Sequence, residues 1–391
     1  MQFLNYVPFF IVISYSLFIV LLYIYWINKP LDIINFDNVN CNENEIKSIV
    51  ASVVITVRNE EKNINDCLNS LLKQKLYSNK IEILISDDYS SDNTITQIKK
   101  IISTNENSLI DIKIIQPDDS NNGYIYGSKK QAQERAIKQA KGDIIILTDA
   151  DCIFNEKWII SIISYLKNND ALFISAPVKI VYDNTLWSKI QSLEFTSLVI
   201  SGAASIIMGC PLMSNAANIA FTKSAYSEIV DKIPSKHLLS GDDIFLMVAF
   251  TKKFGHKKIH FIKNYDTIVY TKPLPNFISF LSQRIRWSSK AITYKDFFQI
   301  FISFLVFLAN ASIILYIVLS LFSLKYITLL VSAFIVKLIV DSALIYEGLV
   351  FFNSTRLILL VLPLQIIYPF YVTIVPLLSL FVKVKWKGRS I

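Results

Sequence analysis

The chain has 391 residues, of which 53% are apolar, a larger share than soluble globular proteins usually carry. This composition argues against a wholly soluble protein. The net charge is +8, but no basic stripe with interleaved aromatic residues accompanies it, so we exclude nucleic acid as a partner and attribute the charge to the bias of Lys and Arg near membrane spans.

Cysteine and histidine usage argues against two classes of site. Cys41, Cys67, Cys152 and Cys210 stand far apart, without CxxC spacing, in a chain too large to depend on disulfides. The histidines show no HxxxH spacing, which disfavours a His-rich zinc site. We therefore expect reduced cysteines in a cytosolic domain.

An uncharged apolar segment occupies residues 6–26. As a helix it covers about 32 Å, which matches the hydrocarbon core of a bilayer. A cleaved signal peptide is the alternative, and the lack of a basic start and of a small-residue cleavage site argues against it. We predict a transmembrane helix over residues 1–27 and a polar linker over residues 28–48.

Short β-branched runs alternate with amphipathic segments over the next hundred residues. Strands are predicted at 49–57, 81–86, 112–115 and 143–147, with helices at 65–72, 92–103 and 128–140. This alternation implies a mostly parallel sheet with helices on both faces. We predict a Rossmann-like α/β domain over residues 49–295.

Polar and acidic side chains follow three of the four predicted strands. They are Asn59 and Glu60 after the first, Asp87 and Asp88 after the second, and Asp149 and Asp151 after the fourth. Ligands of parallel sheets bind at this edge. The turn after the first strand has no Gly-x-Gly-x-x-Gly, which argues against a dinucleotide site.

The segment 158–294 has a mixed pattern. Helices are predicted at 186–208 and 244–254, with a loop at 210–215 between them. The basic run 252–263 is typical of a solvated face or of a surface near anionic lipid headgroups.

Three further apolar segments, 297–323, 326–346 and 357–382, are long enough to cross a bilayer. We predict a C-terminal membrane region over 296–391 with two to three spans. The last segment carries three prolines, and a cytoplasmic basic tail favours a broken or re-entrant helix there.

Lys337 and Asp341 lie at i and i+4 in the second of these segments, so they can pair. A structural pair is preferred over a functional polar path.

Two groups of acids suit the transfer of a sugar from a nucleotide diphosphate. Asp149 and Asp151, closing a strand, suit a divalent cation, Mg²⁺ or Mn²⁺, that neutralises the leaving diphosphate. Asp242 and Asp243 offer a general base for the acceptor hydroxyl. Helix capping is the alternative role for this second pair, and both roles are compatible.

The string QRIRW at 283–287 precedes the membrane region. Its Arg286 can clamp diphosphate oxygens, and Trp287 can pack against a sugar ring. Interfacial anchoring in the membrane is the alternative.

Five strings in this order, VVITVRNEE, ISDDYSSDNT, GDIIILTDADC, SGDDIF and QRIRW, resemble the family 2 glycosyltransferases of the GT-A fold. This group contains the cellulose, chitin, hyaluronan and ceramide glucosyl synthases. The resemblance covers roughly residues 50–290.

The resemblance implies a role for each motif residue. Asn59 and Glu60 would lie at the nucleotide pocket, Asp87 or Asp88 would contact uracil or ribose, and Asp149 and Asp151 would form the metal pair. Asp243 would be the base, Gln283, Arg286 and Trp287 match the Gln-x-x-Arg-Trp motif, and Asn218 would line the acceptor side.

Two departures limit these implications. The base motif is Gly-Asp-Asp rather than Thr-Glu-Asp, which leaves Asp242 as a competitor for Asp243. The membrane region is small for a polymer channel, so transfer of one sugar to a lipid is as compatible as processive synthesis.

We therefore predict an inverting, metal-dependent glycosyltransferase of the cell membrane that uses a UDP-sugar on the cytoplasmic side. Its acceptor would be a lipid or a growing polysaccharide. The alternatives are a membrane sensor that only binds nucleotides, and a nucleotidyltransferase. A nucleotidyltransferase would need a Gly-rich basic loop after the first strand to bind a triphosphate, and this chain has RNEEKN there.

Overall fold

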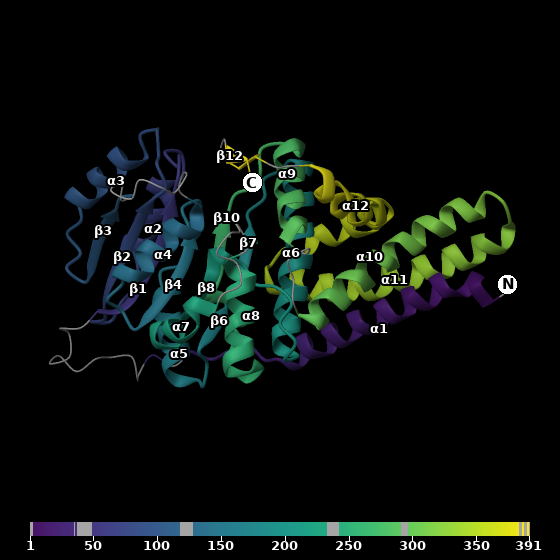
Figure 1. Ribbon diagram of the computed structural model, residues 1–391, viewed down its shortest axis with the longest axis horizontal. Coiled ribbons are helices and arrows are strands. Elements are labelled where there is room, and N and C mark those ends of the chain that lie inside the picture. Colours follow the sequence, from purple (N-terminus) through teal and green to yellow (C-terminus); the bar gives the residue numbers. More distant parts are fainter. Residues whose placement is uncertain are drawn as a thin grey trace. The chain divides into compact units, whose positions relative to one another are not determined.

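A computed structural model describes residues 3–34, 36, 49–117, 128–232, 242–290, 296–382, 385–386 and 389–390. The chain forms two compact units (Figure 1). The sheet unit contains Pro30–Val181 and Pro211–Lys272. The helical unit contains Met1–Lys29, Tyr182–Cys210 and Pro273–Ile391.

The core of the sheet unit is a seven-stranded sheet with the order β3-β2-β1-β4-β8-β6-β9. Its strands are β1 (Ile49–Val57), β2 (Lys80–Asp87), β3 (Ile110–Ile115), β4 (Ile144–Asp149), β6 (Phe173–Ser175), β8 (Ile219–Thr222) and β9 (Ile259–Phe261). Strands β1 to β4 pair in parallel, and β8 runs antiparallel to both its neighbours. The predicted mostly parallel α/β sheet is confirmed.

The helices of this unit lie around the sheet (Figure 1). They are α2 (Ile64–Leu72), α3 (Thr94–Ser103), α4 (Lys129–Gln139), α5 (Trp158–Asn168), α7 (Lys223–Ile229) and α8 (Asp242–Phe254), with short 3-10 turns η4 (Ala216–Asn218), η5 (Val230–Lys232), η6 (His256–Lys258) and η7 (Tyr265–Thr267). A second sheet joins β5 (Cys152–Phe154), β10 (Val269–Thr271) and β7 (Val178–Ile180). Helix α2 is an example of an amphipathic helix that packs on the sheet unit's core. Its apolar residues Ile64, Leu68 and Leu71 recur at helical spacing and are buried.

The register of the sheet brings three strand ends to one edge. Val57 at the end of β1 pairs with Asp87 at the end of β2, and Thr56 pairs with Asp149 at the end of β4. The predicted convergence of the three acidic strand ends is therefore present.

The helical unit contains α1 (Val7–Asn28), α6 (Leu186–Ile207), α9 (Phe277–Ser289), α10 (Phe297–Ser320), α11 (Leu324–Phe351) and α12 (Val361–Phe381). Short elements are η1 (Phe3–Tyr6), η9 (Thr355–Leu360), β11 (Lys385–Trp386) and β12 (Arg389–Ser390). Five helices among the described residues, α1, α6, α10, α11 and Thr355–Phe381, are long and apolar enough to span a membrane. Helix α6 is an addition to the predicted spans.

The last apolar segment changes from 3-10 to α-helix at residue 361. Pro363 lies in the first turn of α12, where a helix needs no amide donor. Pro369 and Pro376 lie inside a helix that continues to Phe381. The helix is therefore not interrupted at these two prolines.

The predicted pair of Lys337 and Asp341 is present, with Nζ 2.6 Å from Oδ2. Gln365 of α12 donates to Asp341 Oδ2 at 2.8 Å and accepts from Lys337 Nζ at 3.0 Å. The Tyr15 hydroxyl of α1 donates to Asp341 Oδ1 at 2.8 Å. Both carboxylate oxygens are thus satisfied by a network that joins three apolar helices, which supports the structural role.

Candidate active site

Hydrogen bonds join the turn after β1 to the loop after β2. Asn59 has a φ of 52°, a left-handed conformation that Asn tolerates. Its Oδ1 accepts from the Ser91 amide at 2.8 Å, and its amide donates to Ser90 Oγ at 3.1 Å. The Glu60 amide donates to Thr94 Oγ1 at 2.8 Å. The two loops therefore form one rigid surface at the sheet edge.

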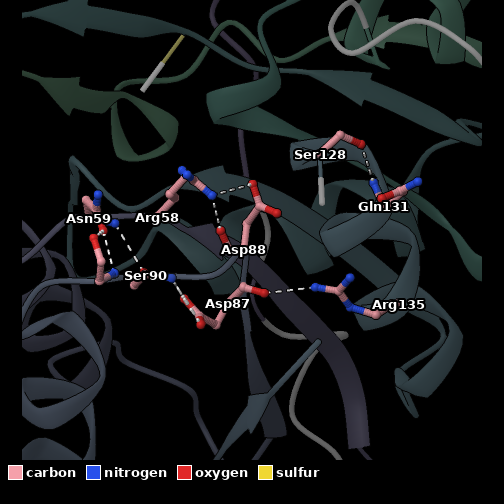
Figure 2. A network of polar contacts seen from close by, with 9 residues as sticks. Arg58, Asn59, Asp87, Asp88, Ser90, Ser128, Gln131 and Arg135 are labelled. Atoms are coloured by element: carbon pink, nitrogen blue, oxygen red, sulfur yellow. Dashed lines mark hydrogen bonds and ion pairs between the residues drawn. The ribbon is translucent and has the colours of Figure 1, made fainter. Parts of the chain in front are cut away.

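Two arginines hold the end of β2 (Figure 2). Arg58 donates to the main-chain oxygen of Asp88 at 2.7 Å and lies 4.0 Å from its carboxylate. Arg135 of α4 donates to the main-chain oxygen of Asp87 at 2.8 Å. Both acids are buried, with Asp87 6% and Asp88 1% exposed, and the Asp87 carboxylate accepts from the Ser90 amide at 3.1 Å. The arginines therefore orient the strand end that carries both predicted donor-binding acids.

Negative charge concentrates after β4. Asp151 is half-buried. Its burial, together with the nearby negative charges of Asp149 and Glu60, raises its pKa to about 6. Lys129, at the start of α4, lies 2.5 Å from Asp149 Oδ1. Asp149 is 32% exposed, so it lies where a ligand can reach it. Asp149 and Glu60 thus lie close enough to Asp151 to affect its charge, and Lys129 is the counter-charge of Asp149.

The donor atoms fit a divalent cation held jointly with a substrate. Within the described residues, no group of three or more His, Cys, Asp or Glu side chains forms a ready metal site. Mg²⁺ is commonly held by one or two carboxylates together with substrate phosphates. Asp149 and Asp151 supply such carboxylates, and the pKa of Asp151 is raised by its burial first and by the charges of Asp149 and Glu60 second.

Asp243 lies at the start of α8, where both of its predicted roles are compatible with the contacts. Its Oδ1 accepts from the Ile244 amide at 2.9 Å, and its Oδ2 accepts from the Ala216 amide at 3.2 Å. The next residue, Ala217, accepts from Thr148 Oγ1 at 2.8 Å. Asp243 is thereby connected to the strand end that carries Asp149. The side chain of Asp242 lies outside the described residues.

Asn218, which was predicted to line the acceptor side, lies in the interior of the sheet unit. Its side chain is fully buried, and its Oδ1 accepts from Trp158 Nε1 at 3.0 Å. Its Nδ2 donates to the main-chain oxygens of Pro177 and Thr267, each at 2.8 Å. These bonds fix the turn before β8, next to Ala216 and Asp243.

The Gln-x-x-Arg-Trp motif lies on α9 in the helical unit. Arg286 and Trp287 are half-buried, and Gln283 accepts from Arg284 Nη1. Arg284, which the motif leaves unspecified, is bound to Glu194 of α6. Separate sequence segments therefore supply the acids and the motif, and they belong to different units.

Several residues that contact predicted site residues, or lie next to them on the same helix, were not singled out in the sequence. They are Arg58, Lys129, Arg135, Glu194 and Arg284. Arg58 and Arg284 lie inside recognised strings, and Lys129 lies at the start of a predicted helix, but their partners are set by tertiary contacts. Among the described cysteines, Cys67, Cys152 and Cys210 are free thiols, as predicted, and Cys41 lies outside the described residues.

The chain matches the family models described as Glycosyl transferase family 2, over residues 52–223, and Glycosyl transferase family group 2, over residues 144–382. It is 27% identical over 195 residues to glycosyltransferase AglE of Haloferax volcanii, covering 49% of this chain and 58% of that protein. It is 28% identical over 287 residues to poly-beta-1,6-N-acetyl-D-glucosamine synthase of Staphylococcus aureus, covering 70% of this chain and 60% of that protein. The chain thus spans less than two thirds of the length of these relatives.

Among solved structures, the fold is similar to that of mannosyltransferase PcManGT from Pyrobaculum calidifontis, in complex with GDP-Man and Mn²⁺. The TM-score is 0.57 at 14% sequence identity, covering 88% of this chain and 98% of that chain. This likeness concerns the fold, and the predicted GT-A class is confirmed. Because the match to Glycosyl transferase family group 2 covers more than half of the chain, the protein belongs to the family 2 glycosyltransferases.

Proposed function

We propose that the protein is an inverting, metal-dependent glycosyltransferase of the cell membrane. It transfers a sugar from a nucleotide sugar to a lipid-linked or polysaccharide acceptor on the cytoplasmic side. The observation that carries this proposal is the convergence of Glu60, Asp149 and Asp151 at one sheet edge, with Asp243 connected to the same strand end.

The donor side of the site uses the loops after β1 and β2. Asn59 and Glu60 shape the nucleotide pocket, and Asp87 or Asp88 binds the base or ribose. Asp149 and Asp151 would hold Mg²⁺ or Mn²⁺, which when bound neutralises the charge of the leaving diphosphate. Lys129, beside Asp149, adds positive charge on the same side.

The acceptor hydroxyl attacks the anomeric carbon opposite the diphosphate. A bond forms between the acceptor oxygen and that carbon, the bond to the diphosphate oxygen breaks, and the configuration inverts. The proton of the hydroxyl passes to the carboxylate of Asp243. The amides of Ile244 and Ala216 hold this carboxylate in one orientation.

The acceptor side is assigned to α9. Gln283, Arg286 and Trp287 belong to the unit that contains the apolar helices, which supports an acceptor supplied from the membrane. Within the sheet unit, Asn218 is the residue proposed for the acceptor side, and its bonds to Trp158, Pro177 and Thr267 fix the turn that carries it. A membrane sensor that only binds nucleotides has no need of Asp243 or of the α9 motif.

The donor and the product are tested together. Membranes containing the protein are incubated with radiolabelled UDP- and GDP-sugars, and the lipid-extractable label is separated from the insoluble polymer. We expect one donor to label one fraction in the presence of Mn²⁺. A UDP-sugar is the first choice, and GDP-mannose is included because the PcManGT structure contains it. Absence of label in both fractions with every donor would contradict the proposal.

A further inference from the structure

A buried ion pair anchors the helix that carries the Gln-x-x-Arg-Trp motif. Arg284 is 4% exposed. Its Nε donates to Glu194 Oε1 at 2.8 Å, and its Nη2 donates to Glu194 Oε2 at 2.5 Å. The Tyr371 hydroxyl donates to Glu194 Oε1 at 3.1 Å. The pair therefore joins α9 to α6 and α12 with a bidentate geometry that only Arg provides.

The same guanidinium lies against the tryptophan of the motif. Its central carbon is 4.2 Å from the ring centroid of Trp287 and 4.4 Å from that of Phe280. Phe280, Arg284 and Trp287 follow one another at helical spacing, so they share one face of α9. The Trp287 ring also contacts Phe195 of α6, with centroids 6.3 Å apart.

These contacts bear on the part of the site that meets the acceptor. Sugar rings bind proteins by placing an apolar face against an aromatic ring, and this contact depends on the plane of that ring. One face of Trp287 is occupied by the Arg284 guanidinium. An ion pair that only joined α9 to α6 would not require the Arg284 guanidinium to stack on Trp287.

We propose that Arg284, held by Glu194, is a positioning residue that sets the plane of Trp287 and presents its remaining face to the acceptor sugar. This inference rests on the proposed function, because Trp287 meets the acceptor only if the protein is a transferase. It assigns to the pair a role in acceptor recognition rather than in donor binding.

The first test measures the ring directly and does not depend on activity. The full chain is labelled with 5-fluorotryptophan, and the ¹⁹F resonance of Trp287 is assigned by its loss in Trp287→Phe. We expect Arg284→Lys, which keeps the charge but loses the planar stack, to shift or broaden this resonance. Tyr371→Phe, which leaves the stack in place, serves as the control. An unchanged Trp287 resonance in Arg284→Lys overturns the inference.

The second test separates the two substrates. In Arg284→Lys we expect the KM for the acceptor to rise about tenfold, because the ring of Trp287 loses the planar stack that sets its orientation toward the sugar. The KM for the nucleotide sugar should stay within about twofold, because the proposal gives Arg284 a role in the acceptor contact alone. A rise in the donor KM alone contradicts the inference.

A charge-swapped variant separates positioning from simple helix pairing. Glu194→Arg with Arg284→Glu restores an ion pair between α6 and α9 but removes the guanidinium from position 284. We expect the acceptor KM of this variant to stay raised. Its full recovery would show that the pair serves only to join the helices. If the wild-type protein transfers no sugar at all, the proposed function fails. The ¹⁹F result then still decides whether Arg284 sets the plane of the Trp287 ring.

Discussion

At the scale of single residues, the candidate site contains three carboxylates in different environments. Asp149 is paired with a lysine, Asp151 is half-buried with a raised pKa, and Asp243 is held by two amides. These differences suit different tasks. The first two suit a cation, and the third suits a proton acceptor with a fixed orientation.

Asp243→Asn tests the base. We expect it to lower kcat by about 10²–10⁴-fold, because the amide cannot take the acceptor proton. Binding of the donor nucleotide should change by less than about twofold, since the side-chain shape is kept. Asp231→Asn, at an exposed position of the same unit, is the control. Full transfer activity in Asp243→Asn would remove this residue from the mechanism.

Asn218→Ala tests whether this residue is structural. The substitution removes the side-chain partner of the Trp158 indole and of the Thr267 carbonyl oxygen, while the Pro177 oxygen keeps the Val269 amide, at a cost of about 1–3 kcal/mol. Thermal unfolding of the full chain in detergent should show a lower Tm. An unchanged Tm with a raised acceptor KM would instead support direct contact with the acceptor.

At the scale of elements, much of the sheet unit was predictable because its signals are local. The strands β1 to β4 and the helices between them follow β-branched runs and helical spacing, and the acids at their ends follow from parallel topology. The reversed strand β8 was not predicted, since four residues, Ile219–Thr222, show no period. The partners of Arg58, Arg135 and Arg284 could not be predicted from the sequence either, because they are determined by tertiary packing.

The start of β4 depends on a close approach of two main chains. A Cβ placed on Gly142 would lie 2.5 Å from the carbonyl carbon of Ala51 in β1. Gly142→Ala must therefore displace β4 from β1, and we expect a loss of about 1–3 kcal/mol in stability. Lys141→Ala, at an exposed side chain beside it, is the control. Equal melting temperatures for the two variants would show that the sheet adapts without cost.

At the scale of the whole molecule, the apolar fraction correctly indicated a set of long helices. It did not indicate that α6 and α9, which carry Glu194 and Arg284, group with those helices. Charged residues lower the apolar signal of such segments, and their pairing is visible only in three dimensions. The sequence therefore predicted the candidate site residues, whereas the grouping of α6 and α9 with the apolar helices is visible only in the structure.

The polar network of the helical unit tests how the apolar helices are held together. Lys337→Met leaves Asp341 buried without its cation, at an expected cost of about 3–5 kcal/mol. The double variant Lys337→Met with Asp341→Leu should recover most of this stability, as measured by thermal unfolding in detergent. A double variant that is stable but inactive would instead favour a functional polar path.

The central claim is that Asp149 and Asp151 bind one cation together with the donor diphosphate. The measurement is calorimetric binding of UDP and GDP to the full chain, with and without Mn²⁺, in the wild type and in Asp151→Asn. We expect Mn²⁺ to strengthen binding of the preferred nucleotide diphosphate in the wild type, and Asp151→Asn to weaken that Mn²⁺-dependent binding by about 10–100-fold. Equal affinities with and without Mn²⁺ in both proteins would contradict the account.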